Sequence, residues 1–254
     1  MDDLQSAILM HETQVPRRYL ECMETAEYRV FRDKSNPDSA CSNYAVLKSR
    51  HDVQASFAAV EAFLEKAGAV PKFASRPDSL PISELAYLFA AHGYAVKSDT
   101  AVQMHLCLQN AAIAAPVHQT AVSQVLQGAQ RELALFQDEG AEYGVRLLDK
   151  QLGAGAVLLH AYDGKRPVAM CLAQGHGDIL YLSDVYTHPD YRRRGYARAA
   201  MQAALTYANA QGYRWAYLYA AGAHARALYA NLGFAAREIS HFWAYAGALP
   251  AWMA

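Results

Sequence analysis

Apolar and polar residues alternate along the chain with two different periods, and this predicts strands interleaved with helices in both halves. Segments rich in β-branched and aromatic residues predict strands, and apolar residues at helical spacing predict helices. The predicted strands cover residues 28–32, 43–47, 72–74, 102–108, 156–162, 167–172, 179–187, 213–219 and 240–245. The predicted helices cover residues 53–67, 84–92, 120–137, 193–208 and 225–232. The interleaving favours an α/β fold, of the mixed α+β kind, in which helices cover a sheet.

The two halves repeat one order of elements at a shift of 140 residues. Gly93 ends a helix in the first half as Gly233 ends a helix in the second. The same shift carries Val53 to Arg193, and each of these residues opens a long Ala-rich helix. Self-similarity of this kind predicts two copies of one supersecondary plan.

A basic, glycine-containing loop separates the predicted strand at 179–187 from the helix that follows it. The loop reads Arg192-Arg193-Arg194-Gly195-Tyr196-Ala197 and continues to Arg198. At such a junction, unpaired backbone N–H groups and the positive end of the helix dipole face any anion that docks there. Gly195 has no Cβ, so a diphosphate can approach the main chain closely. The loop therefore predicts an anion site suited to a polyphosphate.

The loop and a second motif together resemble signatures of the GNAT superfamily of N-acetyltransferases. The pattern Arg-x-x-Gly-x-Ala, after a strand ending near His188-Pro189-Asp190, resembles the acyl-CoA-binding loop of that superfamily. The run from Ala225 to Phe234 resembles its second signature, a short helix ended by a glycine. The resemblance covers roughly residues 140–245. It implies transfer of an acetyl group from acetyl-CoA, held as a co-substrate, to a primary amine in a ternary complex.

The resemblance also implies roles for individual residues. The loop from Arg192 to Arg198 and the main chain of Val185, Tyr186 and Thr187 would bind the coenzyme. Tyr229 would protonate the departing thiolate. Ala223 departs from the pattern, because members of the family often carry Asn at this position. This departure weakens the case for standard geometry near the thioester.

Asp184 is the candidate general base, because it is the only carboxylate in the strand at 179–187. Its alternative roles are pairing with an arginine or capping a turn, and a water chain is an alternative base. We expect His188, which precedes a proline, to face solvent.

The first half lacks the residues that the resemblance assigns to the coenzyme. At the positions of Arg192, Arg194, Gly195 and Tyr229 it carries Asp52, Gln54, Ala55 and Phe89. An aspartate repels an anion, and phenylalanine has no proton to donate. We therefore expect two tandem GNAT-like acyl-CoA N-acyltransferase domains. Residues 1–138 would form a degenerate domain that helps to shape the acceptor site, and residues 139–254 would form the catalytic domain.

Composition excludes several other classes of protein. A net charge of −1 argues against nucleic-acid binding, and 53% hydrophobic residues predict a packed globular protein. The four cysteines and ten histidines show no metal-ligand spacing, so no metal is expected. Gly195 lacks the flanking glycines of a dinucleotide-binding loop, and the chain has no Walker motif. No apolar run is long enough to cross a membrane, which favours a cytoplasmic protein.

Two alternatives to acetyl transfer remain open. One is a non-catalytic module that binds or senses acyl-CoA, and the other is a transferase of a longer acyl group. The acceptor is left as a small molecule, an amino acid or a peptide, and the assembly as a monomer or a homodimer.

Overall fold

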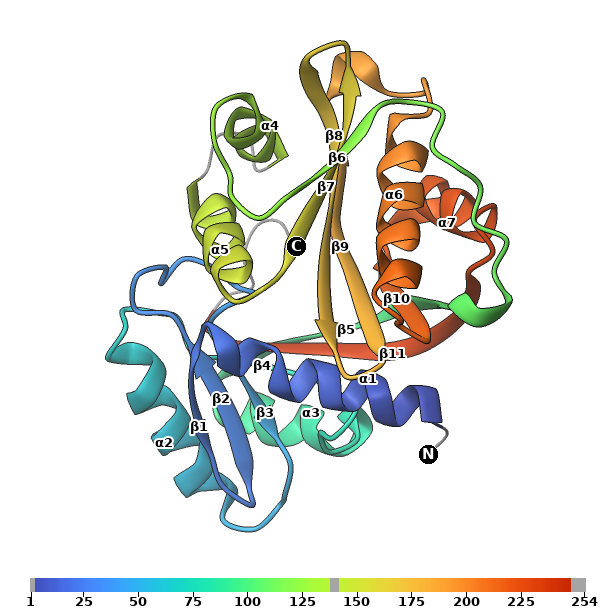
Figure 1. Ribbon diagram of the computed structural model, residues 1–254. Coiled ribbons are helices and arrows are strands. Elements are labelled where there is room, and N and C mark those ends of the chain that lie inside the picture. The colour runs from blue at the N-terminus through green and yellow to red at the C-terminus, as the bar shows by residue number, and fades with distance from the viewer. Residues whose placement is uncertain (1–2, 138–141, 248–254) are drawn as a thin grey trace. The chain divides into compact units, whose positions relative to one another are not determined.

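The computed structural model describes residues 3–137 and 142–247, and they fall into two compact units (Figure 1). Unit 1 combines residues 3–15 with the described part of 102–238, and unit 2 combines residues 16–101 with 239–247. Each unit therefore contains a segment from the other half of the sequence. The boundary predicted between residues 138 and 139 lies outside the described residues.

Unit 1 is built on a mixed sheet whose strands follow the order β5-β10-β9-β8-β7-β6. Within it, β9 and β10 run parallel, and the other pairs are antiparallel. The strands are β6 (Thr120–Ser123), β7 (Val157–Asp163), β8 (Arg166–His176), β9 (Ile179–Thr187), β10 (Trp215–Ala220) and the end of β5 (Tyr94–Cys107).

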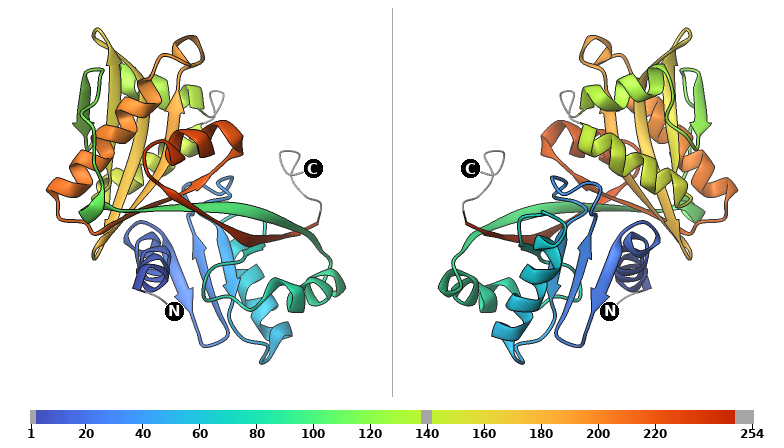
Figure 2. Two further views of the ribbon diagram at one scale, coloured as in Figure 1. Left: turned by 90° about the vertical axis from the view of Figure 1, so that its right-hand side faces the viewer. Right: turned by 90° about the vertical axis from the view of Figure 1, so that its left-hand side faces the viewer.

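Helices cover both faces of this sheet. One face carries α6 (Tyr196–Ala210) and α7 (Gly222–Ala230), and the other carries α1 (Asp3–Gln14), α4 (Ala129–Gln137) and α5 (Glu142–Gly153). Figure 2 shows α6 and α7 in front of the sheet in its left view, and α4 and α5 in its right view. Side chains alternate accordingly, because Leu159 packs in the cluster of α6 whereas Leu158 packs in the cluster of α4 and α5. Burial on both faces explains why the central strands are continuously apolar.

Unit 2 is also built on a sheet with helices, but both of its helices pack in one apolar cluster on the same face. Its strand order is β1-β2-β3-β4-β11, and its helices are α2 (Val53–Glu65) and α3 (Ile82–Ala91). The strands are β1 (Glu21–Glu24), β2 (Tyr28–Arg32), β3 (Tyr44–Leu47), β4 (Lys72–Ala74) and the end of β11 (Ala235–Ala246). Short 3-10 turns lie at Pro16–Arg18 in this unit and at Leu108–Asn110 and Pro189–Tyr191 in unit 1.

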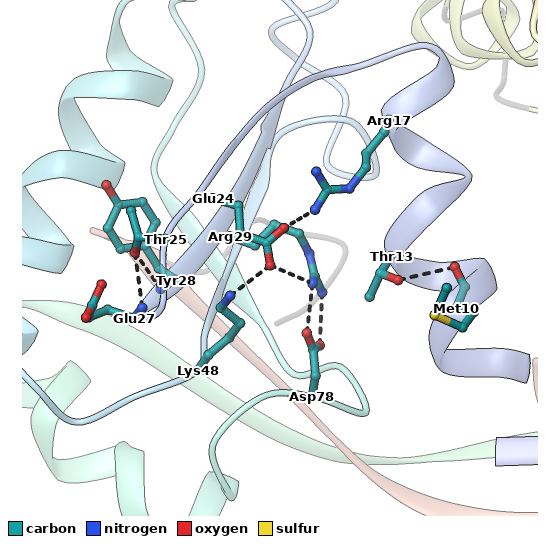
Figure 3. A network of polar contacts seen from close by, with 10 residues as sticks. All are labelled: Met10, Thr13, Arg17, Glu24, Thr25, Glu27, Tyr28, Arg29, Lys48 and Asp78. Carbon is teal, nitrogen blue, oxygen red and sulfur yellow. Dashed lines mark hydrogen bonds and ion pairs between the residues drawn. The ribbon is translucent and has the colours of Figure 1, made fainter. Parts of the chain in front are cut away.

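An ion pair between a buried arginine and a partly exposed aspartate connects the sheet of unit 2 to the loop before α3 (Figure 3). Arg29, which is 2% exposed, donates to both oxygens of Asp78 at 2.7 and 2.9 Å. Glu24 lies 3.5 Å from the same guanidinium and also pairs with Lys48. A bidentate pair is directional, so it fixes how the Asp78 side chain lies against Arg29 of the sheet.

Most predicted elements are confirmed, and one helix is wrong. The strands β2, β3, β4, β9 and β10 and the helices α2, α3, α6 and α7 lie where the pattern places them, within a few residues. Residues 120–123 of the predicted helix at 120–137 are instead the strand β6, which pairs with β7. The helix begins only at Ala129, because Gly128 adopts a left-handed conformation (φ 51°) that ends the preceding turn. The helix α1 was not predicted.

The order of elements repeats as predicted, but the shift of 140 residues is not constant. The series β3-α2-β4-α3-β5 corresponds to β9-α6-β10-α7-β11. Gly93 and Gly233 keep the shift, and both have positive φ. The helix α2 begins at Val53, whereas α6 begins at Tyr196, three residues later than the shift requires. The residue that precedes α2, Asp52, is therefore the counterpart of Gly195.

His160 in β7 yields a test of the fold through the pH dependence of stability. The side chain is 0% exposed, and in the described part of the chain neither ring nitrogen has a hydrogen-bond partner. Burial lowers its pKa from 6.5 to about 4. Between these pH values the unfolded chain binds a proton that the folded chain does not, so stability falls as the pH drops. We expect a loss on the order of 3 kcal/mol across this window.

The variant His160→Leu should remove this loss, because leucine has a similar volume and does not titrate. Urea unfolding at a series of pH values from 4 to 7 measures the effect. The control is His51→Leu at an exposed position of unit 2. Its stability should depend on pH in the same way as that of the native protein. If the free energy of unfolding of His160→Leu falls with decreasing pH as steeply as that of the native protein, His160 is not the cause of the pH dependence.

Candidate active site

The strands β9 and β10 separate along their length and leave one edge of β9 unpaired. They pair only from Ile179 to Tyr181, opposite Trp215 to Tyr217. Beyond Tyr181, β9 continues to Thr187 with no partner on that side among the described residues. An unpaired parallel edge inside a sheet presents N–H and C=O groups that an extended ligand can use.

A β-bulge lies on this unpaired stretch. Met170 pairs with Tyr186 and Leu172 pairs with Ser183, so Asp184 and Val185 together oppose a single residue of β8. Asp184 adopts a left-handed conformation with φ 50°, which is unusual for a residue other than glycine. Strained residues of this kind are concentrated at functional sites.

The side chain of Asp184 is held by two neutral donors. One carboxylate oxygen accepts from the Gln137 amide at 3.0 Å, and the other accepts from the Ser183 hydroxyl at 2.8 Å. No arginine is among its partners in the described part of the chain, so the alternative of an arginine pair does not apply. The bond from Gln137 ties the end of α4 to the bulge.

The loop between β9 and α6 exposes a series of backbone donors. Arg193 (φ 65°) and Gly195 (φ 88°) both adopt left-handed conformations, and Gly195 caps α6 without any side-chain bond. Within the described residues, the N–H groups of Arg193, Arg194 and Gly195 donate to no protein acceptor. These free donors and the positive end of α6 have the chemistry that suits an anion.

The arginine side chains of this loop rest on aromatic rings. Arg192 donates from Nε to the Thr187 carbonyl at 3.2 Å, and its guanidinium lies 5.9 Å from the ring centroid of Tyr186. Arg194 lies 5.6 Å from the ring centroid of Tyr191. No carboxylate pairs with Arg192, Arg193 or Arg194 in the part of the chain that the structure describes. Their positive charge is therefore available to a ligand.

Tyr229 is presented by α7. It is 6% exposed and belongs to the same apolar cluster as Val185 of β9. Burial raises the pKa of its hydroxyl above the usual value, and the neighbouring Cys171 thiol adds to this effect. The phenol is therefore protonated at neutral pH, as a proton donor must be. Ala223 lies in the exposed first turn of the same helix.

The structure corrects the expectation for His188 and adds residues that the sequence did not indicate. His188 is only 7% exposed, its Nδ1 accepts from the Asp190 N–H, and its ring lies 4.6 Å from that of Phe136. Gln137 and Ser183 belong to the site through Asp184. Nothing in their sequence context sets them apart, because the contacts depend on how α4 packs.

The predicted residues gather on two adjoining features. Asp184, Val185, Tyr186 and Thr187 lie on the unpaired stretch of β9, and the arginine loop follows directly after it. The Thr187 hydroxyl is buried without a partner among the described residues. Among the same residues, no group of histidine, cysteine and carboxylate side chains could hold a metal ion. None of the described helices is long and apolar enough to cross a bilayer.

Comparison with solved structures shows the fold over nearly the whole chain. A GCN5-related N-acetyltransferase from Kribbella flavida matches with a TM-score of 0.71 at 15% identity, covering 96% of this chain and 95% of that one. A tandem GNAT protein from the clavulanic acid biosynthesis pathway matches with a TM-score of 0.61 at 16% identity, covering 97% and 94%. A functionally unknown conserved protein from Staphylococcus epidermidis matches with a TM-score of 0.68 at 10% identity, covering 96% and 99%.

Comparison of sequences identifies the family of the second half. No curated protein matches the chain. The family model described as "Acetyltransferase (GNAT) family" matches residues 124–234, a range that contains β9, the arginine loop and Tyr229. Members of this family are acyltransferases that use acyl-CoA and an amine. Residues 124–234 are therefore a GNAT acetyltransferase domain, within a chain that has the fold of a tandem GNAT protein.

Proposed function

We propose that the protein is an N-acetyltransferase that moves an acetyl group from acetyl-CoA to a primary amine in a ternary complex. The observation that carries this proposal is the row of unused N–H groups from Arg193 to Gly195, placed where the unpaired edge of β9 ends. A diphosphate fits these donors. An extended pantetheine arm fits the edge that leads away from them.

The coenzyme is bound in two parts. The loop from Arg192 to Arg198 binds the diphosphate through its N–H groups and its uncompensated arginines. The main chain of Val185, Tyr186 and Thr187 pairs with the pantetheine arm, which adds to the sheet like a short strand. The thioester then lies near the bulge at Asp184. Holding both reactants in this way contributes most of the acceleration, within the effective-molarity range of about 7–11 kcal/mol.

The chemical step requires three proton transfers. Asp184 accepts a proton from the ammonium group, and the neutral amine attacks the thioester carbon, so that a C–N bond forms. The C–S bond then breaks, Tyr229 donates its phenolic proton to the departing thiolate, and the protonated amide nitrogen releases its extra proton to water. Acid–base assistance of this kind adds on the order of 10²–10⁴-fold to the rate.

The first half of the chain, residues 1–138, is a degenerate domain without a coenzyme of its own. Two contacts in unit 2 support this. The Asp52 carboxylate accepts from the Ala55 N–H at 3.4 Å and places a negative charge at the start of α2. Leu47, at the end of β3, corresponds to Thr187 at the end of β9. Its carbonyl accepts a hydrogen bond from the Leu80 N–H at 2.9 Å, so this backbone group is already paired within the protein. We therefore expect one coenzyme per chain.

Calorimetry with acetyl-CoA tests the binding site. The native protein should bind one molecule per chain. Gly195→Glu should lower the affinity by about 100-fold, because it adds a negative charge beside the diphosphate and a Cβ that presses on the His118 ring, 3.4 Å from its Nε2. The matched control is Gly212→Glu at the other end of α6, where φ is also positive (79°) and an added Cβ would have no neighbour within 4 Å. Both variants carry the same backbone strain, so only the first should lose affinity. Native affinity in Gly195→Glu, or no affinity in the native protein, would overturn the proposal.

Tyr229→Phe tests the proton donor. The kcat for thiol release should fall by about 10²–10⁴-fold, whereas the affinity for acetyl-CoA stays within about twofold. Tyr207→Phe, at a partly buried position of α6, is the control and should keep the native kcat. An unchanged kcat in Tyr229→Phe would remove this role. A native protein that binds acetyl-CoA but acetylates no member of an amine panel would instead support the sensing module.

Asp184→Asn tests the general base through the pH–rate profile. The variant keeps the shape of the side chain but cannot accept the proton, so the pH–rate profile of kcat/KM should change shape and the rate at neutral pH should fall by about 10–100-fold. Ser183→Ala removes one hydrogen bond to the same carboxylate and should keep the shape of the native profile. A profile for Asp184→Asn that overlays the native one would exclude the aspartate and leave a water chain as the base.

A further inference from the structure

We propose that His118 is a positioning residue that holds the coenzyme loop in its binding conformation. The inference rests on the proposed function of that loop. His118 lies in the connection between the 3-10 turn at Leu108–Asn110 and β6, outside both motifs that resemble the acetyltransferase family. Three contacts join it to the loop, and all of them lie within unit 1.

The first contact is a hydrogen bond that fixes one peptide plane. The imidazole Nε2 of His118 lies 2.8 Å from the Arg194 carbonyl oxygen, and since a carbonyl only accepts, Nε2–H is the donor. No cis peptide occurs among the described residues. In a trans peptide the C=O and the following N–H point in opposite directions. The bond therefore turns the Gly195 N–H away from His118 and toward the open side of the loop.

The second contact is a stack that fixes the first residue of α6. The rings of His118 and Tyr196 lie nearly parallel, with centroids 4.0 Å apart and planes inclined by 29°. At the end of the same side chain, the Tyr196 hydroxyl donates to the Asp163 carboxylate at 3.0 Å. Tyr196 is therefore held between the β7–β8 turn and the imidazole, and the start of α6 cannot rotate without breaking one of these contacts.

The third contact concerns the space around Gly195. A Cβ at this position would lie 3.4 Å from the His118 Nε2. The imidazole thus occupies one side of Gly195. An anion can approach from the opposite side, toward which the Gly195 N–H points. The left-handed conformation of Arg193 is unfavourable for a residue other than glycine, so the loop needs contacts from outside to keep this shape. His118 supplies them.

Steady-state kinetics with acetyl-CoA distinguishes positioning from general stability. His118→Ala should raise the KM for acetyl-CoA about tenfold and leave kcat within about twofold, because the contact orders the diphosphate donors and does not touch the thioester. His118→Gln keeps a side-chain N–H donor and should recover more of the KM than His118→Phe, which keeps only the stack. Val117→Ala, at the neighbouring position that is 79% exposed, is the control and should behave as the native protein.

Calorimetry with CoA should show the affinities in the same order as the KM values, with the glutamine variant binding more tightly than the phenylalanine variant. The melting temperature of each variant should stay close to that of the native protein. Native KM values in all three His118 variants would overturn the proposal. So would losses of kcat and of melting temperature that are equal in the alanine, glutamine and phenylalanine variants. A native protein that neither binds nor uses acetyl-CoA would instead show that the proposed function itself has failed.

Discussion

Unsatisfied backbone donors at the start of α6 are the constraint on which the rest of the site depends. Three consecutive N–H groups, from Arg193 to Gly195, have no acceptor among the described residues, and the helix has no side-chain cap. Such groups are tolerated only where water or a ligand can reach them. The exposed loop, its two left-handed residues and the arginines that rest on tyrosine rings all keep the donors accessible. Every other contact described for the loop maintains this arrangement.

The two halves of the chain differ in the residue that precedes the corresponding helices α2 and α6. The helix α2 begins after Asp52, whose carboxylate satisfies the Ala55 N–H, whereas α6 begins after Gly195, which satisfies none. An aspartate cap stabilises a helix by about 1 kcal/mol relative to alanine and by a few tenths of a kcal/mol relative to glycine. The first half thus gains local stability at the place where the second half keeps an open anion site. This contrast is the physical content of the proposal that only the second half binds the coenzyme.

The sequence predicted the parts of the site that depend on local pattern. The strand Ile179–Thr187 and the loop after it follow from an apolar run, a glycine and an Ala-rich helix, so they were located correctly. The parts that depend on pairing between distant segments were missed. Residues 120–123 have helix-compatible neighbours but pair with β7, and His188 precedes a proline but packs against Phe136. The bulge at Asp184 is set by its register with β8, which no local pattern encodes.

The proposed recognition of the coenzyme through the main chain makes few demands on side chains, and the fold itself is compatible with very different sequences. The structures that match this chain over 94–99% of their length share only 10–16% of its residues. A backbone donor requires a local conformation rather than a particular side chain, and at Gly195 the positive φ of 88° favours glycine. The loss of the usual asparagine at Ala223 fits this view. The helix α7 also begins without a side-chain cap, at Ala221, so its first N–H groups remain unsatisfied by any side chain. If the coenzyme is held mainly by main-chain groups, the substitution removes one contact and leaves the basis of recognition intact.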